Sequence, residues 1–337
     1  MPLSLLKTTS HLSDFQKAMG AKKLIIQIPC YNEAEQIGAC LRALPREIPG
    51  YDSVETLVVD DGSQDATVAR AREANATHIL ALGHHRGLAQ AFSEGTRYAF
   101  LSLGAASLVN FDADLQYEAA DIATVVAPLL QGRADYVLGE RPLQAHPHFS
   151  PLKKALQKIG SLFVSGMCGF PIRDATTGFR ALNREAGLRL SVWSDYTYTL
   201  ETLVHAKSLD LRIASVPIRV SSTSPRPSRL LRSNLQYCLT SVRTVLLTVA
   251  RYRPFTFFLF AGAAAFSGAL VLGLRFLWYY MQHDSGKIQS VILCAVLMVV
   301  GVLLTLFAIL AENISLNRRL LEDLRYENRL EELRRAR

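Results

Sequence analysis

Residues 107–116 read S-L-V-N-F-D-A-D-L-Q, an apolar strand-like run that ends in two acidic residues. Side chains alternate faces along a strand, so we expect Asp112 and Asp114, two positions apart, to project to the same side. Like charges held this close repel each other. The pattern therefore predicts that a cation lies between the two carboxylates.

Similar strand-like runs occur on both sides of this stretch. Each is short, rich in β-branched residues and nearly continuous in apolar character, as is typical of parallel strands covered on both faces. They span 24–29, 55–60, 77–82, 107–112 and 135–139, and helical windows lie between them at 33–44, 65–75, 87–100 and 119–131. This alternation predicts an α/β fold with a mostly parallel sheet, whose ligands bind beyond the carboxyl ends of the strands.

The last third of the chain contains two apolar runs, 255–274 and 288–311, each long enough to cross a bilayer as a helix. Arg251 and Arg253 precede the first run, Arg318, Arg319 and Arg325 follow the second, and the connecting loop has a single lysine. The positive-inside rule then predicts that both chain ends and the first domain are cytoplasmic. The N-terminus shows no pattern of a secretory signal, which agrees with this orientation.

The net charge of +8 is concentrated next to the apolar runs. Between Pro217 and Arg253 there are seven arginines and no acidic residue, a composition suited to anionic lipid head groups rather than to nucleic acid. The five cysteines are scattered without a C-x-x-C pair, so they indicate neither zinc nor disulfides but a reducing compartment: Cys30, Cys40, Cys168, Cys238 and Cys294.

Three polar clusters stand at predicted strand ends, which meet at one edge of a parallel sheet. They are P-C-Y-N-E (29–33), V-D-D-G-S-Q-D-A-T (59–67) and F-D-A-D-L-Q (111–116). Neither G-x-G-x-x-G after the first strand nor a P-loop motif occurs, so phosphates must be neutralised in another way. The carboxylates of Asp112 and Asp114 with the amide oxygen of Gln116 are hard ligands that suit Mg²⁺ or Mn²⁺ shared with substrate phosphates.

With these motifs the chain resembles the family 2 glycosyltransferases, specifically the dolichyl-phosphate mannose synthase-like branch that glycosylates polyprenyl phosphates. The resemblance extends over about residues 23–230 and also includes G-E-R (139–141) and T-T-G-F-R-A-L (176–182). It implies a Rossmann-like, glycosyltransferase A-type domain followed by juxtamembrane helices and a two-helix membrane hairpin. The expected parts are an N-terminal extension (1–22), the catalytic domain (23–225), a basic juxtamembrane segment (226–253), the hairpin (254–312) and a cytoplasmic helical tail (313–337).

The resemblance also implies roles for individual residues. Those that match nucleotide-contacting positions are Pro29, Tyr31, Glu33 and Asp61. Those that match the metal and diphosphate site are Asp112, Asp114 and Gln116. Those expected to face the acceptor phosphate are Arg141, near it Lys153, and Arg219 or Arg226, which flank the family's position without coinciding with it. Catalysis would then rest on Asp112, Asp114 and Arg141.

The expected reaction follows from the acceptor's charge. A phosphate monoester has a second pKa of about 6, so a polyprenyl phosphate is largely dianionic at neutral pH and attacks without a general base. Direct displacement would invert the anomeric centre. Analogy with hairpin-bearing bacterial members favours a UDP-sugar over GDP-mannose as donor. Leucines interleaved with charges in 315–337 are also compatible with a short coiled coil and hence a homo-oligomer.

Three alternatives remain open at this point. A processive polysaccharide synthase would need a Q-x-x-R-W motif, which neither Trp193 nor Trp278 has. A transferase acting on a lipid alcohol would need a catalytic base, for which Asp174 is the candidate. The third alternative is a non-catalytic membrane scaffold that only binds a nucleotide or a partner.

Overall fold

The computed structural model describes residues 22–142, 165–166, 171–192, 198–220, 254–282 and 288–335. The chain forms two compact units. One consists of Met1–Asn234 together with Asn328–Arg337, and the other of Leu235–Glu327.

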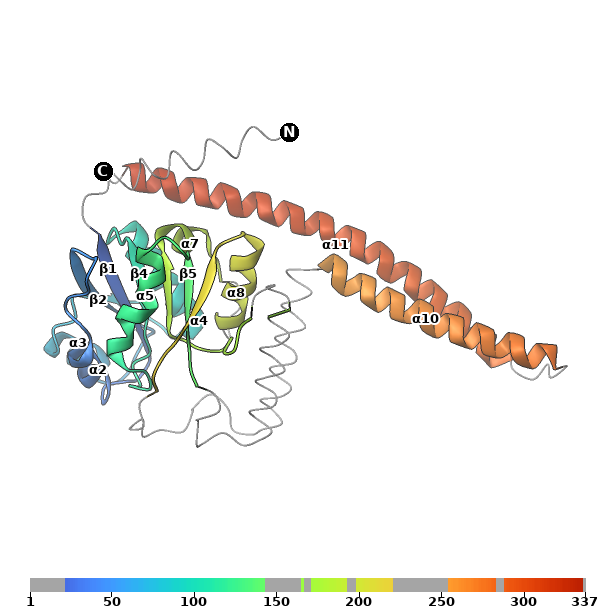
Figure 1. Ribbon diagram of the computed structural model, residues 1–337, viewed down its shortest axis with the longest axis horizontal. Coiled ribbons are helices and arrows are strands. Elements are labelled where there is room, and N and C mark those ends of the chain that lie inside the picture. The colour runs from blue at the N-terminus through green and yellow to red at the C-terminus, as the bar shows by residue number, and fades with distance from the viewer. Residues whose placement is uncertain are drawn as a thin grey trace. The chain divides into compact units, whose positions relative to one another are not determined.

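The first unit is built on a seven-stranded sheet with the order β3-β2-β1-β4-β6-β5-β7 (Figure 1). The strands are β1 (Lys23–Cys30), β2 (Ser53–Asp60), β3 (His78–Ala81), β4 (Ser107–Asn110), β5 (Tyr136–Glu140), β6 (Arg180–Asn183) and β7 (Ile213–Pro217). Strand β6 runs antiparallel to both of its neighbours, β4 and β5, and every other pairing is parallel. The predicted mostly parallel α/β sheet is confirmed, with the five predicted strands in place.

Two strands, β6 and β7, were not predicted from the sequence. Strand β6 has four residues and begins with the fully buried Arg180, so its sequence lacks the apolar run of a buried strand. Strand β7 is only partly buried along its length. Strand β6 was missed because its apolar character is weak, whereas β7 is largely apolar but short, and it lies at the edge of the sheet.

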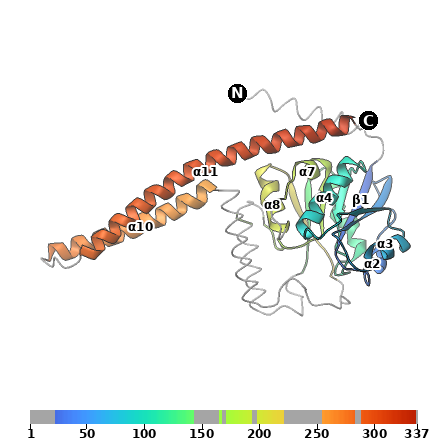
Figure 2. The ribbon, with the colours of Figure 1, turned by 180° about the vertical axis from the view of Figure 1, so that it is seen from behind.

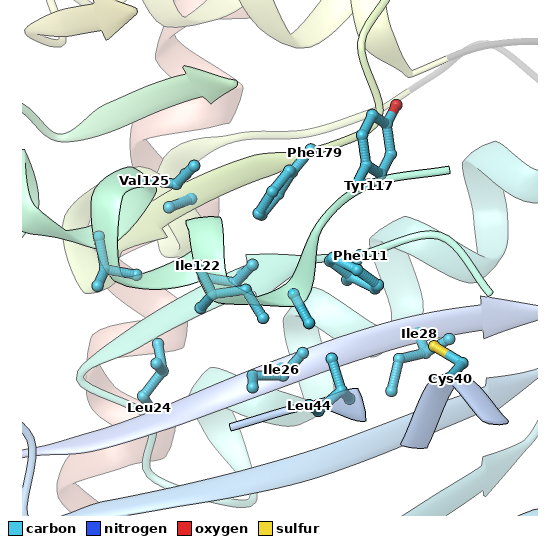
Figure 3. Packing of buried hydrophobic residues seen from close by; sticks show 14 of the residues in the cluster. Leu24, Ile26, Ile28, Cys40, Leu44, Phe111, Tyr117, Ile122, Val125 and Phe179 are labelled. Carbon is cyan, nitrogen blue, oxygen red and sulfur yellow. The ribbon is translucent and has the colours of Figure 1, made fainter. Parts of the chain in front are cut away.

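Helices cover both faces of the sheet. Their bounds are α2 (Ile37–Ala43), α3 (Thr67–Glu73), α4 (Leu88–Leu101), the 3₁₀ turn η1 (Ala119–Asp121), α5 (Ile122–Leu130), α7 (Arg184–Arg189) and α8 (Thr199–Ser208). The side chains of β1 alternate between the two faces of the sheet. Leu24, Ile26 and Ile28 belong to the core shared with Ile122 and Val125 of α5 (Figure 3).

The other face of β1 meets α4. The buried side chain of Gln27 donates to the carbonyl of Phe92 in this helix at 3.2 Å. Phe92 in turn stacks on Tyr198, which directly precedes α8, with ring centroids 4.0 Å apart. Helices α4, α7 and α8 can be followed in the view from behind (Figure 2). Together the two covered faces explain the continuous burial of β1.

The second unit contains α10 (Pro254–Met281) and most of α11 (Ile288–Arg335), both long and apolar enough to cross a membrane. The two helices approach closely at glycines, as is common in membrane helix pairs. A Cβ at Gly262 would lie 3.3 Å from the carbonyl oxygen of Gly301, and one at Gly301 would lie 3.0 Å from the ring of Phe266. The segment expected as a separate tail, 313–337, continues the second helix as far as Arg335.

Candidate functional site

The two acids of the D-A-D sequence lie in a turn and not in the strand. Strand β4 ends at Asn110, and the turn that follows includes Leu115 with a positive φ of 56°. The expectation that strand alternation aligns Asp112 with Asp114 was therefore wrong, because the chain leaves the sheet before it reaches them. Their charges nevertheless interact, since Asp114 is a cause of the altered pKa of Asp112.

Proton affinity in this turn is unusually high. Burial first, and then the charge of Asp114, raise the pKa of Asp112 to about 7, although Arg141 and a hydrogen bond from Tyr117 oppose the shift. Burial also raises the pKa of Asp114. Each carboxylate lacks enough positive charge around it to stay ionised at its usual pKa. A bound cation would supply that charge.

The loop before β6 packs directly against Asp112. A Cβ on Gly178 would lie 2.6 Å from Oδ2 of Asp112, closer than Cβ contacts normally are, so a larger residue here would force the carboxylate or the loop to shift. The amide of Gly178 donates to the hydroxyl of Tyr117 at 3.1 Å. The T-T-G-F-R sequence thus forms the wall behind the acidic turn.

The donor set suits a divalent cation that also takes oxygens from a substrate. The amide of Gln116 donates to Oδ1 of Asp114 at 3.0 Å, and its side-chain oxygen accepts from Nη1 of Arg141 at 3.4 Å. Among the described residues no group of three or more His, Cys, Asp or Glu side chains could hold a metal. Two carboxylates would therefore hold the ion only with further donors, such as Gln116 or diphosphate oxygens.

Arg141 follows β5 at the same edge of the sheet and is fixed by Asp174. Its Nε and Nη2 donate to the two oxygens of that carboxylate at 2.6 and 3.2 Å. Burial alone would raise the pKa of Asp174, but the charge and hydrogen bonds of Arg141 hold this pKa below its usual value. A carboxylate with a lowered pKa is a weak base, which argues against the role of Asp174 as the base for an alcohol acceptor.

The other expected acceptor groups divide into two sets. Arg219 follows β7 and forms an ion pair with Asp121, with Nη2 at 2.7 Å from Oδ1. A bridge between Tyr117 and Val220 brings this segment beside the residues that follow the acidic turn. Arg219 therefore lies at the expected edge, while Lys153 and Arg226 lie outside the described residues.

The predicted nucleotide residues lie at the ends of β1 and β2. Pro29 is buried in β1, Tyr31 is partly exposed just after it, and Glu33 begins the turn toward α2. The two strand ends are joined by hydrogen bonds: the amide of Asn32 donates to Oγ of Ser63 at 3.0 Å, and that of Glu33 to Oγ1 of Thr67 at 2.9 Å.

Asp61 has a different environment from the one expected for a residue that binds a base. It is almost fully buried and accepts hydrogen bonds from the amides of Arg86 and Gly87, both at 2.8 Å. Nδ1 of His85 lies 2.8 Å from its Oδ2. These three contacts use most of the acceptor capacity of a carboxylate. Asp61 thus anchors the loop after β3, and its contact with a base stays a prediction.

His85 is the site residue that the sequence reading missed. Its exposed ring stacks on Tyr31, with centroids 3.9 Å apart and an interplanar angle of 24°. The signal was available, because G-H-H-R-G (83–87) follows the strand-like run 77–82 just as the other polar clusters follow theirs. The pair presents an aromatic surface beside the anchored loop.

The fold and this site define a glycosyltransferase of the A-type fold. Residues 25–187 match the profile of Glycosyl transferase family 2, and the chain belongs to this family. UDP-N-acetylglucosamine–dolichyl-phosphate N-acetylglucosaminyltransferase of Methanococcus voltae is 30% identical over 61% of this chain and 88% of its own length. Undecaprenyl-phosphate mannosyltransferase of Micrococcus luteus is 30% identical over 58% and 82%. The predicted family is confirmed.

A solved structure agrees with the fold. Glucosyl-3-phosphoglycerate synthase from Mycobacterium tuberculosis, in complex with Mn²⁺, UDP and glucosyl-3-phosphoglycerate, superposes with a TM-score of 0.53 over 71% of this chain and 82% of that one. The sequence identity is 20%, so this likeness concerns the fold. That neighbour was crystallised with a divalent cation and a uridine nucleotide.

Proposed function

We propose that the protein is an inverting, divalent-cation-dependent transferase that moves a sugar from a nucleotide sugar, preferably a UDP-sugar, to a polyprenyl phosphate at the cytoplasmic face of a membrane. The observation that carries this proposal is the turn of Asp112 and Asp114 beside Arg141. The pKa values of both acids are raised, and the guanidinium of Arg141 lies beside them at the carboxyl edge of the sheet.

The acid pair supports a role for Mg²⁺ or Mn²⁺. Asp112 and Asp114, with Gln116, would hold the ion, which when bound stabilises negative charge on a leaving diphosphate. Residues of the chain hold these donors in place. Gly178 packs against the carboxylate of Asp112, and the amide of Gln116 donates to the carboxylate of Asp114. This arrangement fits a nucleotide diphosphate as leaving group.

The names of the relatives support the substrate classes. One is named for a UDP-sugar with dolichyl phosphate, and another for mannosyl transfer to undecaprenyl phosphate. Both names specify a polyprenyl phosphate as acceptor. The first name favours a UDP-linked donor.

The charges around Arg141 support a phosphate acceptor over an alcohol. A dianionic phosphate needs positive groups to approach a second anion, but it does not need a base. Arg141 supplies such a group, and Arg219 lies at the same edge. Attack from the face opposite the leaving group would invert the anomeric centre and give a β-linked product from an α-linked donor.

Two apolar helices support a membrane location. The arginines around them favour an orientation with the catalytic domain and both chain ends in the cytoplasm. The hairpin would hold the domain at the surface where the phosphate of a polyprenyl lipid lies.

Transfer by the full-length protein in nanodiscs tests the proposal. Labelled UDP-glucose, UDP-N-acetylglucosamine and GDP-mannose are each offered with Mn²⁺ and with undecaprenyl phosphate, undecaprenol or diacylglycerol. We expect label in the phosphate lipid, loss of transfer in EDTA, and a β-anomer by NMR of the product. Transfer to an alcohol but not to the phosphate, or full transfer in EDTA, would refute the proposal.

A further inference from the structure

Asp174 and Arg141 form a buried, bidentate ion pair. The carboxylate has no solvent exposure, and the guanidinium side chain is 10% exposed. Nε donates to Oδ2 at 2.6 Å and Nη2 to Oδ1 at 3.2 Å, which is the parallel fork geometry that fixes an arginine in one orientation. Both oxygens of Asp174 therefore already accept hydrogen bonds from Arg141 within the protein.

Thr176 completes the fixation. Its hydroxyl donates to Oδ1 of Asp174 at 2.9 Å and accepts from Nη2 of Arg141 at 3.0 Å. The amide of Thr176 also donates to Oδ1 of Asp174 at 3.2 Å. The loop and the guanidinium are therefore ordered by the same carboxylate.

These contacts determine which edge of Arg141 faces the acidic turn. A guanidinium has five N–H donors, and those on Nε and Nη2 are directed at Asp174 and Thr176. Nη1 points instead toward Gln116, at 3.4 Å from its side-chain oxygen. This long contact is the weakest of the set, so Nη1 is the nitrogen best placed to exchange its partner for a substrate oxygen.

We propose that Asp174 is a positioning residue that holds Arg141 so that Nη1, and not the Nε–Nη2 edge, meets the acceptor phosphate. The inference rests on the proposed function, because it assumes an anionic acceptor at Arg141. It assigns Asp174 no contact with the acceptor and no proton transfer. The step it serves is attack by a phosphate oxygen on the anomeric carbon while the bond to the diphosphate breaks, and no proton needs to leave a dianionic phosphate.

A double-mutant cycle separates positioning from base catalysis. Asp174→Asn, Arg141→Gln and the double variant are compared with the wild type in nanodiscs for kcat, for KM of undecaprenyl phosphate and for Kd of the nucleotide sugar. We expect Asp174→Asn to raise this KM about tenfold while kcat and donor Kd change less than threefold. In the Arg141→Gln background the same change should alter KM less than twofold, because the residue it orients is gone.

A base at Asp174 predicts the opposite pattern. Asp174→Asn would then lower kcat at saturating acceptor by about 100-fold or more, and by the same factor whether position 141 carries arginine or glutamine. Either finding would overturn the positioning role. Asp174→Asn also leaves a buried guanidinium without its partner and can fail to fold. In that case the double variant decides, since equal kinetics to Arg141→Gln support positioning and a further 100-fold loss of kcat contradicts it.

Asp135→Asn is the matched control. Asp135 precedes β5 at the opposite end of the same strand and forms a similar pair with Arg212, with contacts of 2.9 and 2.7 Å. This variant should lower stability without raising the KM of undecaprenyl phosphate, so an equal KM effect would mark the Asp174 result as merely structural. Wild-type transfer alone decides the proposed function, whereas the comparison of variants decides the role of Asp174.

Discussion

Asp61 and Asp112 both follow parallel strands near the middle of the sheet, but Asp61 is almost fully buried and Asp112 is half-buried, and their surroundings differ. Asp61 accepts from two backbone amides and lies beside the ring of His85, all within the chain. Asp112 faces a second carboxylate, and its pKa is raised to about 7. The difference indicates that Asp61 organises a loop, whereas the positive groups around Asp112 do not compensate its burial and the charge of Asp114, as expected of the metal ligand proposed above.

The substitution Asp114→Asn should have the largest effect on transfer. Removing one of two metal-binding carboxylates should lower the transfer rate by about 10³-fold, because a divalent cation contributes several kcal/mol to stabilising a diphosphate leaving group. Metal titration by calorimetry and initial transfer rates measure the effect. Glu94→Gln, on the exposed side of α4, is the control and should behave as the wild type. Undiminished turnover of the Asp114→Asn variant would show that Asp114 is not a ligand of a catalytic metal ion.

Gly178→Ala tests whether the wall behind Asp112 matters. The new methyl group would lie 2.6 Å from Oδ2, so the carboxylate or the loop must move at a cost of about 1–3 kcal/mol. We expect the affinity for Mn²⁺ to fall about tenfold or more, with a parallel fall in transfer. Gly38→Ala is the matched control, because its Cβ in α2 would meet only the end of the Arg42 side chain, at 3.4 Å. Equal effects of both changes would deny Gly178 a special role.

Asp61→Asn tests whether Asp61 anchors the loop after β3. Loss of the charge-assisted hydrogen bonds should loosen the loop of His85 and Arg86, at about 1.5–3 kcal/mol. The Kd for the nucleotide should rise about tenfold while the affinity for Mn²⁺ alone stays unchanged. Calorimetry with UDP and with Mn²⁺ separates the two. A loss of Mn²⁺ affinity would show that the two strand ends are not independent.

The sequence predicted most of the sheet on which both acids stand but not the contrast between them, and the parts it missed have physical reasons. The regular apolar runs predicted five strands and both long helices, because burial on two faces demands such runs. Strand β6 was missed because its buried Arg180 finds partners in Tyr136, Thr202 and loop carbonyls, which are distant in sequence or invisible to apolar patterning. The D-A-D motif was recognised for its residue types, but not its turn, since Leu115 gives no glycine signal for a positive φ.

For the site residues, too, the sequence predicted their positions but not their partners. Motif positions located Asp61, Asp112 and Arg141 at one edge of the sheet, because parallel strands end together. The partners of these residues could not be read from the sequence. The pairs Arg141–Asp174 and Asp61–His85 join residues 33 and 24 positions apart in the sequence, and each pair determines what its acid can do.

The last test concerns stability as a function of pH. The folded-state pKa of Asp112 lies near 7, above the usual value of 3.8, so the folded protein binds more protons than the unfolded chain between about pH 4 and 7. Stability from this group is therefore fully present below pH 4 and is lost as the pH rises through 7. Asp174 has a lowered pKa, so its contribution is lost only as the pH falls through that lower value.

Thermal unfolding of the wild type and of Asp112→Asn in EDTA, from pH 5 to 8, measures the difference. We expect the wild type to lose stability relative to the variant as the pH rises, since the amide side chain of the variant does not ionise. Every other group is the same in both proteins and cancels in the comparison. Saturating Mn²⁺ should remove the pH dependence from the wild type alone, because a bound cation offsets the charge that burial and Asp114 make costly. Parallel curves in EDTA would mean that groups within the chain already compensate the charge of Asp112, and the contrast between the two strand ends would disappear.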